Sequence, residues 1–198
     1  MKIKLKIVFT TLFMLTASMA VNAIETYVGI GGTTGSGTYG ATAAISNFTV
    51  SASTSYDSSS VPVKIGRILA NNNRLEVSYQ SISASSGGLS TETISGGNID
   101  YKLFTKDTSL GKFTPYGLIG MGLYEWENTA QYFVGNDNLF GVSWNVGVGG
   151  VYGMNENIEI EVTAQYKQIF WQDIKVGSVT ITSDNSGTEL YLGLNYKL

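Results

Sequence analysis

The chain contains no cysteine and no histidine, and these absences exclude several classes of function. Without histidine, no Ser-His or Cys-His pair can activate a nucleophile, and no imidazole can bind a metal. Without cysteine there is no thiolate zinc site, no iron–sulfur cluster and no disulfide framework. We therefore expect no metal, no cofactor and no enzymatic activity.

Charged residues are also scarce. They make up 14% of the 198 residues, whereas typical soluble domains have about 25%. The formal net charge of −3 argues against a nucleic acid as partner. Proline is nearly absent, with 2 residues, but the chain has 24 glycines and 12 tyrosines. The length suits a single domain.

The N-terminal segment, residues 1–23, has the features of a secretory signal peptide. Lysines within the first six residues precede an apolar run at 7–15, and Val21 and Ala23 occupy the −3 and −1 positions of a cleavage site. We expect cleavage after Ala23, export from the cytoplasm and a mature domain spanning 24–198. An uncleaved membrane anchor is the alternative, but the apolar run is shorter than the ~20 residues that a spanning helix needs.

After residue 23 the dominant pattern is alternation of apolar and polar residues. In the segment 158–167, isoleucine, valine, alanine and tyrosine alternate with glutamate, threonine, glutamine and lysine. Successive side chains of a β-strand point to opposite faces, so each such run predicts a strand with one apolar and one polar face. The predicted strands lie at 25–32, 61–69, 75–83, 98–105, 115–127, 140–154, 158–173 and 188–198.

Long and short connections alternate between these strands. The long ones span 33–60, 84–97, 128–139 and 174–187, and the short ones span 70–74, 106–114 and 155–157. All long connections would lie at one end of an up-and-down meander, which is the layout of an outer-membrane barrel with short periplasmic turns and longer external loops. Part of the first long loop, around 43–54, could extend into a hairpin above the membrane.

The polar faces of the strands carry charges of both signs at mid-strand, which the lumen of a narrow closed barrel can pair. Glycines on the same faces leave room there for long side chains. We therefore predict an all-β fold: a closed, antiparallel, up-and-down transmembrane β-barrel of eight strands, with apolar residues facing lipid. The expected polar network of the lumen comprises Lys64, Glu76, Asp100, Lys102, Glu159, Glu161 and Lys167.

Aromatic residues gather near the strand ends, as in the girdles at the two interfaces of outer-membrane barrels. The predicted girdle comprises Trp126, Trp144, Trp171, Tyr116, Tyr152 and Tyr196. The strand at 115–127 is ambiguous, because both of its faces carry apolar residues. We favour Ile119, Met121 and Leu123 for the lipid face.

Two segments carry a family resemblance. The segment 113–124 (Phe-Thr-Pro-Tyr-Gly-Leu-Ile-Gly-Met-Gly-Leu-Tyr) and the tail 190–198 (Leu-Tyr-Leu-Gly-Leu-Asn-Tyr-Lys-Leu), within the eight-strand layout, resemble the small outer-membrane β-barrel family of the OmpA membrane domain, OmpX and Ail. The tail is similar to the family's C-terminal assembly signal, here Tyr196 and Leu198, although it ends in leucine instead of an aromatic residue.

The resemblance implies a location and a set of partners. The expected location is the outer membrane, and the expected partners are its lipid and lipopolysaccharide, the barrel assembly machinery, and a surface ligand bound through the long loops. The implied role is envelope integrity, adhesion or resistance to attack. An outer-membrane lipid A-modifying enzyme has similar size and topology, but the known active sites of those families use a histidine. A secreted soluble β-barrel that binds a small ligand is the other alternative.

Several charged residues permit a second interpretation. Glu159 and Glu161 share a face and could serve acid–base chemistry, but we favour ion pairs with lysines of the lumen or with Arg67. Scattered acidic residues could bind Ca²⁺, but we favour solvated loop charge; these are Asp137, Asp173 and Asp184. Arg67 and Arg74 flank a short turn, and we expect both to reach lipid headgroups.

Overall fold

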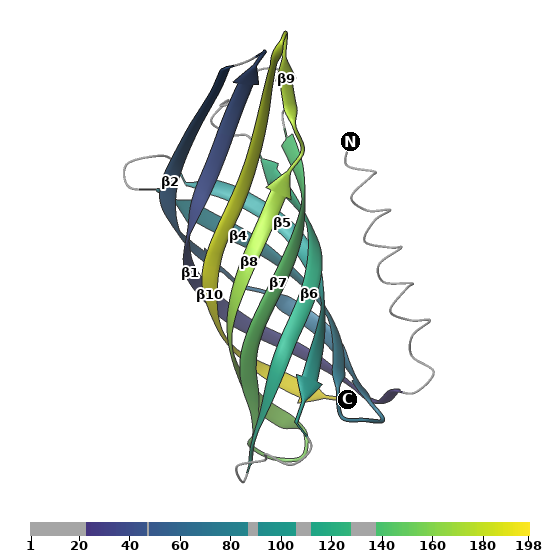
Figure 1. Cartoon of the computed structure of the whole chain (residues 1–198). Helices are drawn as coiled ribbons and strands as arrows, with labels where there is room; N and C mark the ends of the chain where they lie inside the picture. The colour runs from purple at the N-terminus through teal and green to yellow at the C-terminus, as the bar shows by residue number, and fades with distance from the viewer. Residues whose placement is uncertain (1–22, 47, 87–90, 106–111, 128–137) are drawn as a thin grey trace.

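The computed structural model describes residues 23–46, 48–86, 91–105, 112–127 and 138–198, and almost all of them lie in β-strands (Figure 1). The strands are β1 (Ala23–Ile45), β2 (Phe48–Ser60), β3 (Val63–Leu69), β4 (Arg74–Ser85), β5 (Glu92–Phe104), β6 (Phe113–Glu127), β7 (Asn138–Gly153), β8 (Ile158–Trp171), β9 (Ile174–Val176) and β10 (Val179–Lys197). Among the described residues, no helix has the length and apolar composition to cross a membrane. The predicted signal peptide, apart from Ala23, lies outside the described residues.

The strands are antiparallel and neighbour one another in chain order, except that β1 lies between β2 and β3 and β10 lies between β8 and β9, so the predicted all-β, up-and-down architecture is confirmed. Strand β1 pairs with β3 on one side and with β10 on the other. The strands β1, β3, β4, β5, β6, β7, β8 and β10 therefore form a ring in which each is hydrogen-bonded on both sides. This ring satisfies backbone donors and acceptors along its length and leaves no sheet edge within it.

The prediction that 33–60 is a long loop is wrong. Strand β1 continues to Ile45 and pairs with β2 from Thr33↔Ser60 to Ile45↔Phe48. On its other side β1 pairs with β10 up to Ile45↔Val179. The hairpin expected around 43–54 exists, but it is the tip of a much longer one. Serine and threonine can occupy a strand whose hydrogen bonds are supplied by neighbours on both sides, so their polarity does not make this segment a loop.

Two other predicted loops are shorter than expected, for the same reason. Strand β4 continues to Ser85 and β5 begins at Glu92, so 84–97 is largely strand. Most of 174–187 belongs to β9 and β10, which are joined by a tight turn with Gly177 at φ 61°. Of the loop predicted at 128–139, residues 128–137 lie outside the described residues.

Together β2, the distal half of β1, the start of β10 and β9 form a sheet that rises past the ring at one end (Figure 1). We call this four-stranded sheet the extension. Both described ends of the chain lie at the opposite end of the ring, where Leu198 N donates to Thr26 O (2.9 Å). The ring therefore has one end with the termini and one end that carries the extension.

Candidate functional site

The interior of the ring holds a network of charged side chains. All seven residues predicted for the lumen are buried there: Lys64, Glu76, Asp100, Lys102, Glu159, Glu161 and Lys167. They are contributed by β3, β4, β5 and β8. Because these residues are far apart in the sequence, only the closing of the strands on one another brings them together.

Four of these residues form a compact cluster across the ring. Lys64 Nζ lies 2.7 Å from Glu161 Oε2 and 3.1 Å from Glu76 Oε2. Lys102 Nζ lies 2.6 Å from Glu161 Oε1 and 2.7 Å from Glu76 Oε2. Each lysine thus contacts both glutamates, and the formal charges in this cluster balance. The exposed fraction of Glu161 is 1% and that of Lys102 is 2%, so the cluster is removed from solvent.

Neutral donors complete the coordination of the two glutamates. Tyr116 Oη donates to Glu161 Oε1 (2.6 Å), and Asn195 Nδ2 donates to Glu161 Oε2 (2.7 Å). Tyr27 Oη donates to Glu76 Oε2 (2.9 Å). Buried carboxylates are stable only when such partners replace their hydration, so these neutral residues belong to the network as much as the lysines do.

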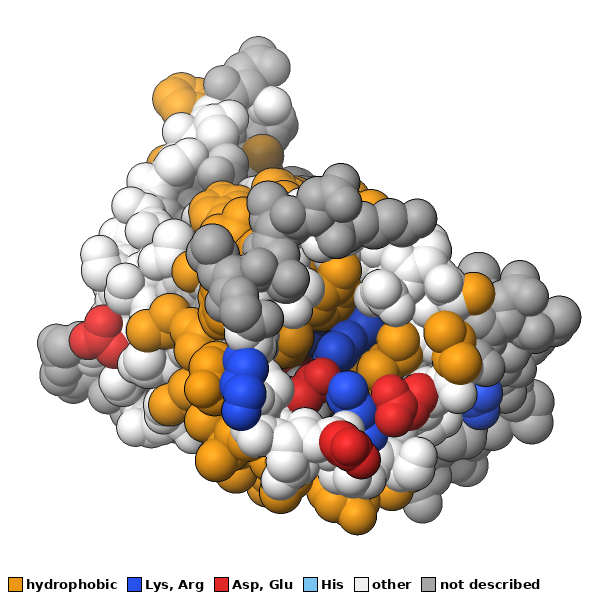
Figure 2. Space-filling view, turned by 90° about the horizontal axis from the view of Figure 1, so that it is seen from below, with side chains coloured by type: hydrophobic (Ala, Val, Ile, Leu, Met, Phe, Trp, Pro, Cys, Tyr) orange, Lys and Arg blue, Asp and Glu red, His pale blue; other side chains and the backbone are white. Residues whose placement is uncertain are grey.

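A second ion pair lies at the end of the ring that carries the termini. Arg74 donates to both carboxylate oxygens of Glu159, at 2.6 and 2.9 Å, and Lys197 Nζ lies 3.0 Å from the same carboxylate. The guanidinium also stacks over the rings of Tyr27 and Phe104. Figure 2, which views the molecule from this end, shows charged side chains of both signs inside a hollow ringed by apolar ones.

The expectation that Arg74 reaches lipid headgroups is therefore wrong. Its side chain is buried inside the ring because Arg74 shares the inward face of β4 with Glu76. Arg67, by contrast, is exposed on the outer side of β3, away from the interior carboxylates with which it was expected, as an alternative, to pair. Side chains alternate between the two faces of a strand, so Arg67 on β3 points outward and Arg74 on β4 points inward, although only a short turn lies between them in the sequence.

Towards the extension the network continues with different partners. Lys167 Nζ lies 2.9 Å from Glu189 Oε2, which also accepts from Gln165 Nε2 (2.7 Å). Asp100 accepts from Asn145 Nδ2 (2.9 Å). Neither Glu189 nor Asn145 was included in the predicted network, although both lie on the polar faces of predicted strands. Lys167 was expected to contact Glu159 or Glu161, whereas it pairs with Glu189.

An apolar layer fills the ring at its extension end. It comprises Ile82, Ile94, Tyr124, Trp126, Leu139, Ile169, Trp171 and Ile174. The rings of Trp126 and Trp171 pack with centroids 5.6 Å apart, and Trp171 Nε1 donates to Asn185 Oδ1 (2.5 Å). The interior is therefore divided into a charged zone and an apolar zone.

Three of the six predicted girdle residues are wrong, because Tyr116, Trp126 and Trp171 point into the ring. On β8, Trp171 lies an even number of residues from Glu161, so both must share the inward face. On β6, Tyr116 and Trp126 alternate with the outward Ile119 and Met121, which were correctly assigned to the outer face. Leu123, also assigned to that face, is half-buried.

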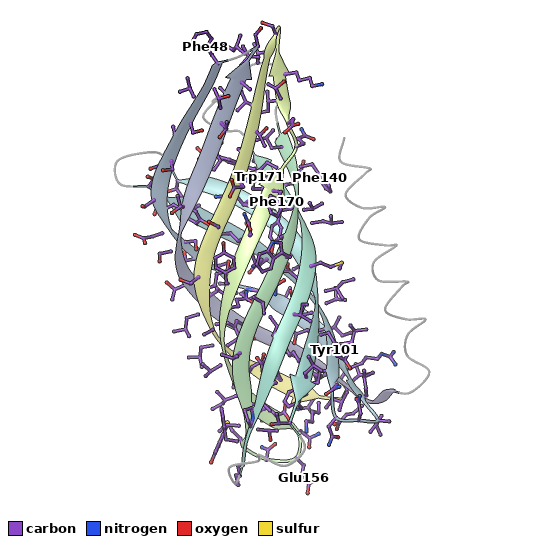
Figure 3. All side chains as sticks on the ribbon, viewed as in Figure 1. Phe48, Tyr101, Phe140, Glu156, Phe170 and Trp171 are labelled. Atoms are coloured by element: carbon purple, nitrogen blue, oxygen red, sulfur yellow. The ribbon has the colours of Figure 1, made fainter. Side chains whose placement is uncertain are left out.

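The other three predicted girdle residues point outward. Trp144, Tyr152 and Tyr196 are exposed, as is the terminal Leu198. They lie among a band of exposed aliphatic residues on the outer faces of β1, β3, β6, β7, β8 and β10: Val28, Ile30, Val63, Ile65, Ile119, Met121, Val142, Val146, Val148, Val162, Leu190, Leu192 and Leu194. Figure 3 shows side chains projecting outward all along the ribbon.

Two small cavities lie in the described part of the interior. A cavity of about 40 Å³ lies among the charged residues of the network, and one of about 20 Å³ lies beside Lys167 and Glu189. A single water needs at least ~10–15 Å³ by this type of measure, so these spaces hold a few waters at most. No group of three or more metal-binding side chains occurs among the described residues.

No family model matches the sequence, and no curated protein matches it. Solved structures do match. The outer membrane protein OprG from Pseudomonas aeruginosa aligns with a TM-score of 0.59 at 13% identity, over 89% of this chain and 97% of that one. The outer membrane protein AlkL, determined in lipid bilayers, aligns with a TM-score of 0.54 at 13% identity, over 89% and 91%. The predicted likeness to small outer-membrane β-barrels is therefore confirmed, and at this identity it is a likeness of fold.

Proposed function

We propose that the chain is a non-enzymatic, integral outer-membrane protein, exported by a signal peptide at 1–23 and folded as a closed transmembrane β-barrel. The observation that carries this proposal is the inverted distribution of polarity. Charged side chains are buried inside the ring, whereas aliphatic side chains are exposed on the outer faces of most of its strands. In a soluble barrel the apolar residues would be inside and the charges outside. Hydrocarbon is the solvent that suits the observed arrangement.

The position of the termini supports an orientation. In an exported barrel with an even number of strands, the end that carries the termini and the short turns faces the periplasm. The extension then stands on the cell exterior, where its serine- and threonine-rich outer face suits water. Lipid and lipopolysaccharide would contact the aliphatic band, and the barrel assembly machinery would read the C-terminal strand through Tyr196 and Leu198.

We further propose that the lumen is plugged. The ion-pair cluster around Glu161 and the apolar layer around Trp171 lie in series along the interior, and the cavity among the described residues of the charged network has a volume of about 40 Å³. The protein would then act through its surface and its contribution to the envelope, in integrity, adhesion or resistance, more than through transport. The extension, the end of the β4–β5 hairpin and the predicted loop at 128–139 are the surfaces that we propose for an external ligand.

Cell fractionation with a gel-mobility assay tests this function. We expect the protein in the outer-membrane fraction, soluble only with detergent, and with a mobility that changes on heating because a folded barrel resists unfolding by detergent at room temperature. Recovery from the periplasm without detergent would overturn the proposal and favour a secreted soluble barrel.

A further inference from the structure

Among the described residues, the distal part of β2 has an edge with no strand paired to it. Only residues 57–60 of β2 pair with β4 on that side, and Thr54 Oγ1 lies 3.0 Å from Ser86 Oγ, whereas Phe48–Ser53 pairs only with β1 among the described strands. Ile45 and Phe48 are joined by two residues, which makes them a hydrogen-bonded pair. Backbone groups of a strand alternate in direction, so those of Thr49, Ser51 and Ser53 point to the free edge.

This edge lacks the features that usually prevent pairing with another chain. Natural edge strands carry lysine, proline or a bulge. The segment Phe48–Thr54 has no charged residue and no proline, and its register with β1 is unbroken. Its residues include Phe48 and Val50, whose exposed fractions are 80% and 70%, and Figure 3 shows Phe48 at the tip of the extension.

The sequence of this edge is complementary to itself. In an antiparallel pair of two copies centred on Ser51, Thr49 lies opposite Ser53 and Val50 lies opposite Ala52 of the second copy. Thr49 and Ser53 thus place hydroxyl opposite hydroxyl, Val50 and Ala52 place apolar side chains opposite each other, and no like charges lie opposite each other. The apolar residues of both copies fall on the same side of the joined sheet, next to Ile45.

We propose that the free edge of β2 binds a second copy of this chain by antiparallel strand pairing centred on Ser51. Copies in one membrane point in the same direction, so their β2 strands run parallel and cannot form this pair. Copies in two facing membranes run antiparallel and can. The proposed partner is therefore a second copy in an apposed membrane, and this step rests on the proposed membrane orientation.

Lipid nanodiscs test the pairing, because both faces of a disc are open to solvent. The full mature chain would be placed in phosphatidylcholine nanodiscs and the particle mass measured by light scattering after size exclusion. We expect a doubled mass at high concentration and two discs facing each other by electron microscopy. Mixing with empty discs must leave those discs single, which excludes insertion of Phe48 into lipid as the cause.

Two variants separate edge pairing from folding. Ser51→Lys puts like charges opposite each other, and Ser51→Pro removes a donor that faces only the free edge; both should give single discs while the gel mobility still changes on heating. Ser51→Thr is the matched control and should still pair. Wild-type discs that stay single, or pairing by Ser51→Lys equal to wild type, would overturn the inference.

A cysteine probe gives the register, because the chain has no cysteine of its own. Ser51→Cys should form a disulfide between two copies under mild oxidation, since directly opposite residues have Cα atoms about 5.5 Å apart. Thr38→Cys, exposed on β1 away from the edge, should not. The same reaction in detergent micelles tests the edge even if the chain fails to enter lipid, so failure of the proposed function and failure of this inference remain distinguishable.

Discussion

At the scale of the residue, Glu161 holds the interior together. Its two oxygens accept from Lys64, Lys102, Tyr116 and Asn195, so one carboxylate joins four strands of the ring to its own. Buried ion pairs contribute little net stability compared with well-packed apolar residues, but removing one partner leaves the other charge uncompensated. The cost of a substitution at this position should therefore depend on what is left behind.

We expect Glu161→Ala to lower the free energy of unfolding by about 3–5 kcal/mol, because it strands two buried ammonium groups beside a single remaining glutamate. Equilibrium unfolding by urea in lipid vesicles measures this change. The double variant Glu161→Ala with Lys102→Met should cost less than the single one, since it removes the uncompensated charge as well.

Glu25 provides a matched control at the rim of the ring. It is partly exposed, and its carboxylate lies 3.8 Å from Lys197 Nζ. Glu25→Ala should cost less than about 1 kcal/mol, as for other solvent-accessible pairs. If both variants cost the same, the interior is hydrated to the same degree as the rim, and burial does not set the cost of breaking an ion pair in this barrel.

The interior residues were largely predictable from alternation, but their partners were not. Lys102 and Glu161 occupy polar positions of clearly alternating strands, which assigns a face without any structure. Which lysine contacts which glutamate depends on the register between the strands, and the sequence does not specify that register directly. The predictions for Arg74 and Trp171 are wrong because nearness to a turn or a strand end does not set the face of a side chain. Its odd or even position along the strand does.

At the scale of the element, β7 offers a direct test of the outer face. Val146 lies at mid-strand on the exposed side, with Trp144 and Val148 as outward neighbours. If this face meets hydrocarbon, Val146→Arg should cost about 2–4 kcal/mol near the bilayer midplane. Urea unfolding in vesicles again gives the value.

Thr182→Arg is the control for the outer face. Thr182 is exposed on the outer face of β10 within the extension, where we place it in water, so the same substituent should change the unfolding free energy little. A neutral Val146→Arg would mean that the aliphatic band is not in lipid. Asn145, which precedes Val146 in the sequence, is not a suitable control, because it is fully buried and lies opposite Lys167 in the register of β7 and β8.

The distal part of the extension should be dispensable for folding. Ala41 and Ala52 form a hydrogen-bonded pair by the same alternation that sets the free edge, so a two-residue turn can join them. Replacing residues 42–51 by Asn-Gly removes exposed side chains that bury little apolar area. We expect a folded barrel with heat-dependent gel mobility and an unfolding free energy within about 1 kcal/mol of wild type. Failure to fold would show that the ring depends on the tip of the extension.

Element boundaries were predictable only where the alternation is aliphatic. Strands of this kind, such as β7 and β8, were placed to within a few residues. The extension was not, because Ser, Thr, Gly and Ala alternate without a hydrophobic signal and are equally common in loops. What makes these residues a strand is the backbone pairing with neighbouring strands, and that pairing is set by the tertiary fold.

At the scale of the whole molecule, the proposed plug has two parts in series. The charged cluster around Glu161 would close the ring by ion pairs, and the layer around Trp171 would close it by apolar packing. Ions cross an apolar constriction poorly even when it is wide enough for water, and they cross a packed salt-bridge cluster only if its pairs separate. Because the two barriers are in series, the higher one limits the ion current.

This arrangement predicts how conductance responds to substitution. The wild-type barrel in a planar bilayer should show no stable open channel. Trp126→Ala with Trp171→Ala should leave the current unchanged, because the charged cluster still blocks the path. Lys64→Ala with Glu161→Ala removes one charge of each sign and leaves the net charge of the interior unchanged, yet the apolar layer should still block the path. Only the variant that carries all four substitutions should give stepwise single-channel currents. A large steady conductance in the wild type, or full opening by either pair alone, would mean that the lumen is not closed twice.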